Sequence, residues 1–157
     1  LRDLGAPLAP DNAWGIIQGL ETVPLRMKQH CANAEKVVQF LETQKKVKNV
    51  IYPTNHQGEI KERAKRYMKG GYGSLVGMDV GSREAGAKFI DNLKMLYHVA
   101  NIGDARSLAI HPATTTHSQL NDEELLAAGV TPGYVRLSIG IEHPDDIIAD
   151  IKQALAA

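Results

Sequence analysis

Tyr134-Val-Arg-Leu-Ser-Ile-Gly-Ile141 is the stretch that decides the fold of this chain. Apolar residues alternate with polar or small ones along it, a period of two that is typical of a β-strand with one buried face. One face carries the side chains of Val135, Leu137, Ile139 and Ile141, and the other carries Tyr134, Arg136, Ser138 and Gly140. The pattern predicts a strand over residues 134–141.

Helical patterns lie on both sides of this strand. Pro144 occupies a favoured first position for a helix, and two aspartates follow where they complement the helix dipole. The expected buried face of this last helix consists of Ile147, Ile151 and Leu155. Before the strand, Asn121 and Glu124 have the spacing of a capping box, which predicts a short helix that ends at Gly129.

The middle of the chain alternates between strand and helix patterns. Short strands are predicted over residues 47–52 and 74–80, and a polar surface helix over 56–69 separates them. The glycines of residues 70–73 predict a sharp turn into the second of these strands. Ser82 is a candidate N-cap for a further helix, whose apolar side would carry Ala85, Phe89, Leu93 and Leu96.

The first 45 residues read as a leading loop and a long helix. Asp11 is the expected N-cap, and Pro24 predicts a kink or a break near residues 22–24. Beyond the proline an apolar stripe at helical spacing predicts a face that packs against the core: Met27, Cys31, Ala34, Val38 and Leu41. Because Cys31 lies on this stripe, we expect a buried and inert thiol.

These elements predict an α+β fold of the open α/β sandwich type. We expect a small, mainly antiparallel sheet with helices packed on it, preceded by a long kinked helix. The 157 residues suffice for one domain, with the leading region at 1–45 and the sandwich at 46–157. Since the chain opens on Leu1-Arg-Asp rather than on Met, we expect either a trimmed or processed N-terminus or a missing upstream domain.

Composition narrows the class of partner. Eighteen basic residues balance eighteen acidic ones, which gives no reason to expect nucleic acid or a lipid surface as partner. No apolar run approaches the roughly 18 residues of a membrane span. The single cysteine precludes an internal disulfide and suits a reducing compartment, so we expect a cytoplasmic protein.

The polar stretch from Val99 to His117 carries the candidate chemistry. Its apolar runs at 99–102 and 107–110 predict a strand–loop–strand wall. His111 and His117 do not have a zinc-site spacing, so no metal site is predicted and both are interpreted as structural. Arg136 is a candidate anion ligand because its guanidinium can bind a carboxylate through two bonds. The pattern alone leaves open that Arg136 is simply exposed or ion-paired within the chain.

Several motifs together resemble the Cys/Met-metabolism enzymes that use pyridoxal phosphate. They are Arg2-Asp-Leu-Gly-Ala, Gln18-Gly-Leu-Glu-Thr, Arg26 to Ala34, Gly70-Gly-Tyr-Gly-Ser, Asn101-Ile-Gly-Asp-Ala-Arg-Ser-Leu, His111-Pro-Ala-Thr-Thr-Thr-His and the strand Tyr134 to Glu142. Within the family, the motifs from Asn101 to His117 most resemble those of O-acetylhomoserine sulfhydrylases. The lyases and synthases tend to carry Ser-Leu-Gly-Gly at the first of these positions.

The resemblance implies a role for three residues. The family's carboxylate-binding arginine falls on Arg136, and the residue that helps to hold the same carboxylate falls on Asn101, where the lyases have serine. A pocket-lining threonine falls on Thr116. The implied fold is the C-terminal domain of a fold-type I pyridoxal-phosphate enzyme.

The resemblance also implies what to expect of the complete enzyme. Sulfide or a thiol would replace acetate at the γ-carbon of O-acetylhomoserine, and the enzyme would be a homotetramer. The family's cofactor lysine stands in a Ser-x-Thr-Lys pattern, which this chain lacks. We therefore expect the chain alone to bind no cofactor and to be inactive. Open alternatives are a cystathionine γ-synthase or lyase of the same family, and a non-catalytic dimerisation or ligand-binding module.

Overall fold

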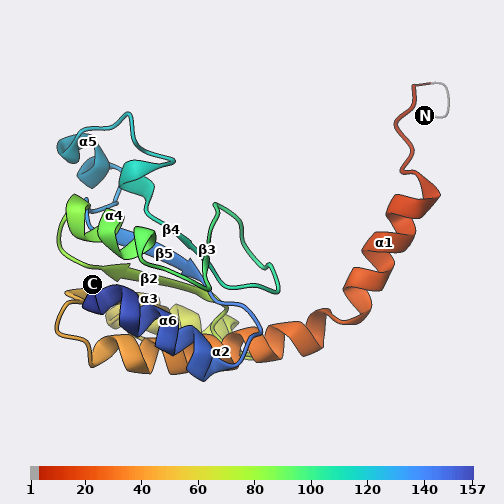
Figure 1. Cartoon of the computed structure of the whole chain (residues 1–157). Coiled ribbons are helices and arrows are strands. Elements are labelled where there is room, and N and C mark those ends of the chain that lie inside the picture. Colours follow the sequence, from red (N-terminus) through yellow and green to blue (C-terminus); the bar gives the residue numbers. More distant parts are fainter. Residues whose placement is uncertain (1–3) are drawn as a thin grey trace.

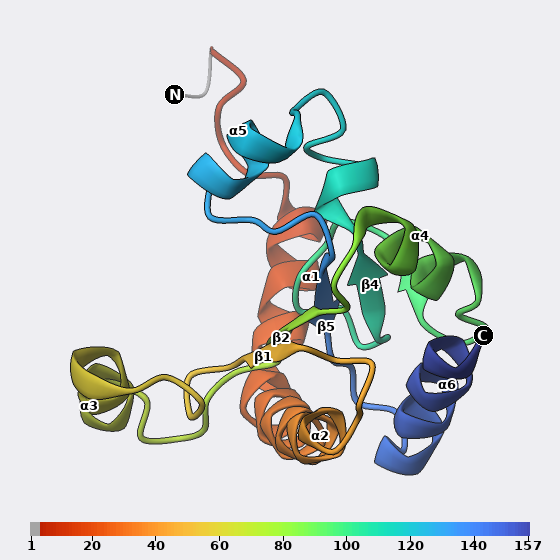
Figure 2. The same ribbon diagram turned by 90° about the vertical axis from the view of Figure 1, so that its left-hand side faces the viewer.

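The computed structural model describes residues 4–157 and shows a five-stranded sheet with helices along one side (Figures 1 and 2). The strands are β1 (Asn49–Ile51), β2 (Leu75–Asp79), β3 (Tyr97–His98), β4 (Leu108–Ile110) and β5 (Tyr134–Ser138). Their order is β1-β2-β5-β4-β3, and all neighbours are antiparallel except β3 and β4. The expected α+β fold with a mainly antiparallel sheet is confirmed.

Three helices form the layer on that side of the sheet. They are α2 (Val23–Glu42), α4 (Arg83–Asp91) and α6 (Pro144–Ala156). The core lies between this layer and the inward face of the strands, where Val76, Met78, Val135 and Leu137 are buried against it. The remaining helices are α1 (Pro10–Glu21), α3 (Gly58–Tyr67), the 3₁₀ turn η1 (Pro112–Thr114) and α5 (Asp122–Ala127).

The leading region is two helices rather than one kinked helix. The break falls at Thr22, inside the predicted interval, because Pro24 stands in the first turn of α2 and has no N–H to donate to a preceding turn. Arg26 stabilises the junction, since its Nη2 donates to the carbonyl of Gly19 at 2.6 Å at the end of α1. The predicted cap at Asp11 is wrong. Ala9 precedes the helix and Pro10 begins it.

The apolar stripe of α2 packs as expected except at its start. Cys31, Ala34, Val38 and Leu41 are buried, whereas Met27 is 39% exposed. His30 and Asn33 are buried beside the stripe and bind the chain just beyond β5. His30 Nδ1 lies 2.6 Å from the Ile139 carbonyl, and Asn33 Nδ2 donates to the carbonyls of Gly140 and Glu142 at 3.0 and 2.8 Å.

Several predicted elements are shorter in the structure. The predicted strand over 134–141 keeps its alternation but ends at Ser138, because the N–H groups of Ile139 and Ile141 donate to loop carbonyls instead of a neighbouring strand. The predicted helix after Ser82 ends at Asp91, and Leu93 and Leu96 reach the core from the following turn. The capping box of α5 and the start of α6 at Pro144 are confirmed.

The predicted strand over residues 99–102 is wrong. The short strand β3 ends at His98, and Val99 and Ile102 are exposed in the loop that follows. The second apolar run does form β4, with all three residues buried. The wall is therefore a loop followed by a strand. Arg2 and Asp3, which belong to the first family motif, lie outside the described residues.

Candidate functional site

The candidate site lies on the sheet face opposite the helical layer. Arg136 stands in the middle of β5, directly opposite Gly77 of β2 and Ile110 of β4. Its neighbours Val135 and Leu137 are fully buried on the helical side, so alternation along the strand directs the arginine away from the core. The predicted orientation of Arg136 is confirmed.

The Arg136 guanidinium has few partners within the protein. Its Nη2 donates to the main-chain carbonyl of Asn101 at 3.4 Å. Among residues 4–157, no carboxylate lies within ion-pair distance of it, although Arg63 and Arg83 each have such a partner. A half-buried guanidinium with five donors and one long bond retains the capacity to bind an oxyanion. This excludes an internal ion pair with a described residue.

Tyr134 and Gly77 shape the surface beside the arginine. A side chain at Gly77 would meet the Tyr134 ring at 2.7 Å, so the glycine allows the ring to lie against β2. Burial raises the pKa of the Tyr134 hydroxyl above its ordinary value, and Arg136 partly offsets this. Arg136, Tyr134 and Gly77 line a hollow of about 200 Å³ together with Ile51 and Leu75.

The loop from Asn101 to Ser107 runs beside β5 and the chain just beyond it. Asn101 accepts the bond from Arg136, and Gly103 N donates to Ser138 Oγ at 3.4 Å. Farther along, Ile141 N donates to the Ala105 carbonyl at 2.9 Å. These contacts connect the loop to the strand that carries Arg136.

Glu142 closes the far end of this loop. Its two carboxylate oxygens accept from Ser107 N at 2.6 Å and from Ser107 Oγ at 2.9 Å, while the same hydroxyl accepts from Gly140 N at 2.8 Å. A Cβ at Gly140 would lie 2.5 Å from both Ala105 O and Ser107 N, so only glycine permits this approach. Glu142 was not among the site residues predicted from the sequence, although its carboxylate directly follows the predicted strand over residues 134–141.

Asn101 and Arg136 are brought together, whereas Thr116 has other neighbours. Asn101 contacts Arg136 through its main-chain carbonyl, while its side chain accepts the N–H of Ile102 at 2.9 Å. Thr116 is exposed in the turns after η1, and its hydroxyl lies 2.9 Å from His117 Nδ1. No hydrogen bond joins Thr116 to Arg136 or Asn101 within the described part of the chain.

His111 has a structural environment. It is fully buried, its Nε2 lies 2.8 Å from the Pro132 carbonyl, and its Nδ1 lies 3.0 Å from Thr114 Oγ1. Burial lowers the pKa of the imidazole, so it is neutral at pH 7. No group of three or more potential metal ligands occurs among residues 4–157. No helix in the same range is long and apolar enough to cross a bilayer.

The residues at this site do not by themselves fit a complete pyridoxal-phosphate site. The cofactor needs a lysine amine within reach, but no lysine lines the hollow beside Arg136. No lysine is buried anywhere in residues 4–157. The site does contain the Arg136 guanidinium, which can bind an anionic group of a substrate through two hydrogen bonds.

Comparison with known proteins identifies the family. The chain is 51% identical over 157 residues to an O-acetyl-L-homoserine sulfhydrylase of Leptospira meyeri, covering 99% of this chain and 36% of that protein. It is 44% identical over 159 residues to an L-methionine gamma-lyase of Fusobacterium nucleatum subsp. polymorphum, covering 99% of this chain and 40% of that protein. The chain therefore spans well under half the length of these relatives.

A solved structure and a family model agree with these relatives. The structure is that of a putative O-acetylhomoserine (thiol)-lyase from Campylobacter jejuni, which contains N'-pyridoxyl-lysine-5'-monophosphate. It matches with a TM-score of 0.88 and 46% identity, covering 99% of this chain and 37% of that one. The model of the Cys/Met metabolism PLP-dependent enzymes matches residues 1–156, and the chain belongs to this family.

Proposed function

We propose that this chain is the substrate-carboxylate-binding part of an O-acetylhomoserine sulfhydrylase. The complete enzyme would replace the acetate of O-acetylhomoserine with sulfide or a thiol and so form homocysteine or a related methionine precursor. One observation carries the proposal: Arg136 presents a half-buried guanidinium with no carboxylate partner among the described residues. The sulfhydrylase from Leptospira meyeri supports the choice of reaction.

Each site residue has a distinct task in this proposal. Arg136 binds both oxygens of the substrate α-carboxylate, a geometry that fixes direction as well as position. The Asn101 carbonyl holds the guanidinium, and the contacts of the following loop with the chain from Ser138 to Glu142 keep that carbonyl in place. Thr116 would contribute to the wall of the substrate pocket. Pyridoxal phosphate, when bound to the complete enzyme, supplies the electron sink for the reaction.

The domain organisation follows from the same proposal. Residues 1–157 form the C-terminal domain, with the leading region at 1–45 and the sandwich at 46–157, and a separate large domain holds the cofactor. On its own, this chain would neither bind pyridoxal phosphate nor catalyse the reaction. The complete enzyme would be a cytoplasmic homotetramer that takes a small amino acid as its substrate.

A lyase reaction is the second candidate. The 44% identity to a methionine gamma-lyase supports elimination as the alternative reaction. A synthase that uses cysteine as the nucleophile is a third outcome within the same family. All three reactions use an amino-acid carboxylate, so Arg136 alone does not separate them.

Product analysis tests the proposed reaction. The complete enzyme, loaded with pyridoxal phosphate, is given O-acetylhomoserine with sulfide or with cysteine, and methionine in a separate reaction. We expect acetate and homocysteine from the sulfide reaction as the main products. Cystathionine as the main product would indicate the synthase, and methanethiol from methionine would indicate the lyase. A purified protein without visible cofactor absorbance, and without any of these products, would indicate a non-catalytic module.

A further inference from the structure

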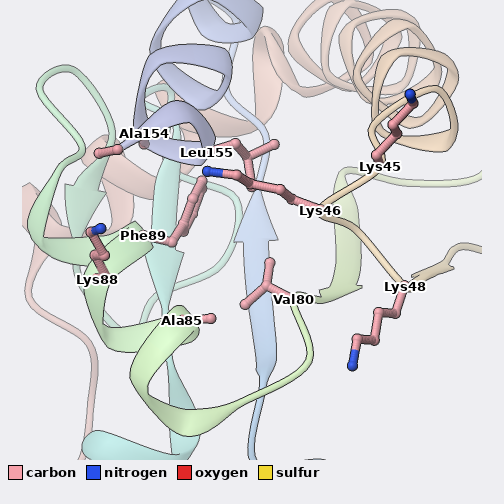
Figure 3. A pocket seen from close by; sticks show the side chains of 10 residues that line it. Lys45, Lys46, Lys48, Val80, Ala85, Lys88, Phe89, Ala154 and Leu155 are labelled. Carbon is pink, nitrogen blue, oxygen red and sulfur yellow. The ribbon is translucent and has the colours of Figure 1, made fainter.

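A second hollow, on the helical side of the sheet, combines an apolar floor with a basic rim (Figure 3). It has a volume of about 370 Å³ and lies where the loop after α2 meets α4 and the last turn of α6. Val80, Phe89 and Leu155 contribute to its floor. Its rim consists of Lys45, Lys46, Lys48 and Lys88.

The charge around this hollow is strongly unbalanced. The whole chain has equal numbers of basic and acidic residues, yet four lysines line this hollow and no aspartate or glutamate side chain does. Its lining includes one acidic group, the main-chain carboxylate of Ala157. None of the four is within ion-pair distance of a carboxylate in the part of the chain that the structure describes. Four like charges that face a single carboxylate still repel each other, and a bound anion relieves that repulsion.

Two of the lysines flank the floor. Figure 3 shows Lys46 extending across the hollow toward Phe89 and Leu155, with Lys88 on the other side of the phenylalanine ring. The Lys46 ammonium has one weak partner, the Ala156 carbonyl at 3.3 Å, which leaves donors available. Lys46 comes from the loop after α2 and Lys88 from α4, so an anion between them would bridge two elements.

This hollow is separate from the site at Arg136. Val80, Ala85 and Phe89 belong to the strand end and helix on the core side, whereas Arg136 lies on the opposite face of the sheet. A ligand here would therefore not compete with the amino-acid substrate. The volume falls within the range of small-molecule sites, which are mostly apolar with a few polar groups that set orientation.

We propose that this hollow binds a small amphipathic polyanion, a nucleoside polyphosphate in chemical class. The phosphates would meet the ammonium groups of Lys46 and Lys88, which act as point charges for phosphate. The base and sugar would cover the apolar floor. Lys45 and Lys48 add to the attraction at longer range, so binding weakens as salt screens the charges.

Calorimetric titration of the purified protein with ATP, inorganic triphosphate and adenosine tests this site. We expect saturable ATP binding at one site per chain, with triphosphate weaker and adenosine weaker still, because each lacks one half of the recognition. The double variant K46E/K88E should weaken ATP binding by about tenfold or more, since two attractions become repulsions. K88E alone should give a smaller loss in the same direction.

Lys36→Glu is the matched control. Lys36 is exposed on α2 outside the hollow. Its change to glutamate alters the net charge by the same amount as K88E does and leaves the proposed site intact. We expect ATP affinity within about twofold of the parent protein. Equal weakening by Lys36→Glu and K88E, no saturable ATP binding, or triphosphate binding as tight as ATP would each overturn the proposal. Unfolding curves of all variants establish that the losses arise in folded protein.

Discussion

At the scale of single residues, Arg136 differs from the arginines that are ion-paired within the protein. Arg63 is paired with Glu59 at 2.7 Å and Arg83 with Asp122 at 2.7 Å, while within residues 4–157 Arg136 bonds only to a carbonyl. Strand alternation predicted which way Arg136 points. Strand alternation could not predict that Arg136 has no carboxylate partner among the described residues. An ion pair depends on residues that are distant in sequence and that only the fold brings close together.

Gly86 shows a second constraint that depends on the fold. A Cβ there would overlap the buried His111 ring, including Nε2 and, at 2.6 Å, Cδ2. His111 cannot easily move, because Pro132 and Thr114 bind its two nitrogens. We therefore expect Gly86→Ala to lower the free energy of unfolding by about 1–3 kcal/mol through overpacking, despite the better helix propensity of alanine.

Gly15→Ala is the matched helical control for this prediction. Gly15 lies inside α1 with nothing within 4 Å of its added Cβ. Only the difference in helix propensity between glycine and alanine then applies. The free energy of unfolding should therefore stay the same or rise by up to about 1 kcal/mol. Denaturant unfolding of both variants measures the difference. Equal effects from the two substitutions would mean that the Gly86–His111 contact has no energetic importance.

At the scale of elements, Glu142 fixes the loop that holds Arg136. Removing its carboxylate in Glu142→Ala leaves the Ser107 N–H without its acceptor. We expect amide hydrogen exchange across residues 102–107 to accelerate by about tenfold, while the amides of β5 keep their protection. Glu123→Ala is the control, since Glu123 is exposed on α5. Unchanged exchange in this loop would contradict the role given to Glu142.

Asp150 fixes another connection, between α6 and the turn before β3. Its carboxylate accepts the backbone N–H groups of Lys94, Met95 and Leu96 at 2.9, 2.9 and 3.0 Å. Burial raises the pKa of Asp150, but the backbone bonds from Leu96, Met95 and Lys94 and the side-chain bond from Gln153 together outweigh it, so the pKa lies below its ordinary value. The ionised carboxylate therefore stabilises the folded state.

Asp150→Asn should lower the free energy of unfolding by about 2–3 kcal/mol near pH 7. Because the folded pKa is lowered, the contribution is complete above the ordinary pKa of an aspartate and is lost as the pH falls through the lowered value. The difference between parent and variant should therefore shrink in acid. A difference that stays constant from pH 7 into that acid range would show that the charge is not the cause.

Sequence patterns within one or two turns predicted most helices and strands, whereas packing between residues distant in sequence determined where several of them end. Pro24, the Asn121–Glu124 capping box and Pro144 act within one turn, so they placed the break and two helix starts correctly. The apolar run at 99–102 looked like a strand, but the loop has its bonds with β5 and the chain beyond it instead of a sheet partner. Periodicity cannot distinguish these two uses of an apolar residue.

At the scale of the whole molecule, α1 stands apart from the body (Figure 1). It has no buried residues, and the only tryptophan of the chain, Trp14, is 66% exposed on it. We expect the tryptophan fluorescence of this 157-residue chain to be red-shifted and readily quenched by acrylamide, as for an indole in water. A blue-shifted emission that resists quenching would mean that α1 packs against another surface in solution, such as a second copy of the chain.

Arg136 as the ligand of the substrate carboxylate is the central claim, and paired inhibitors test it most directly. Homoserine and 3-amino-1-propanol differ only by that carboxylate, and the inhibition constant of each is measured in the complete enzyme and in its Arg136→Ala variant. We expect the variant to bind homoserine about 100-fold more weakly and the amino alcohol within about twofold of the parent. Arg66→Ala, an exposed arginine on α3, should change neither constant. Equal weakening of both inhibitors by Arg136→Ala, or no weakening of homoserine, would contradict the claim.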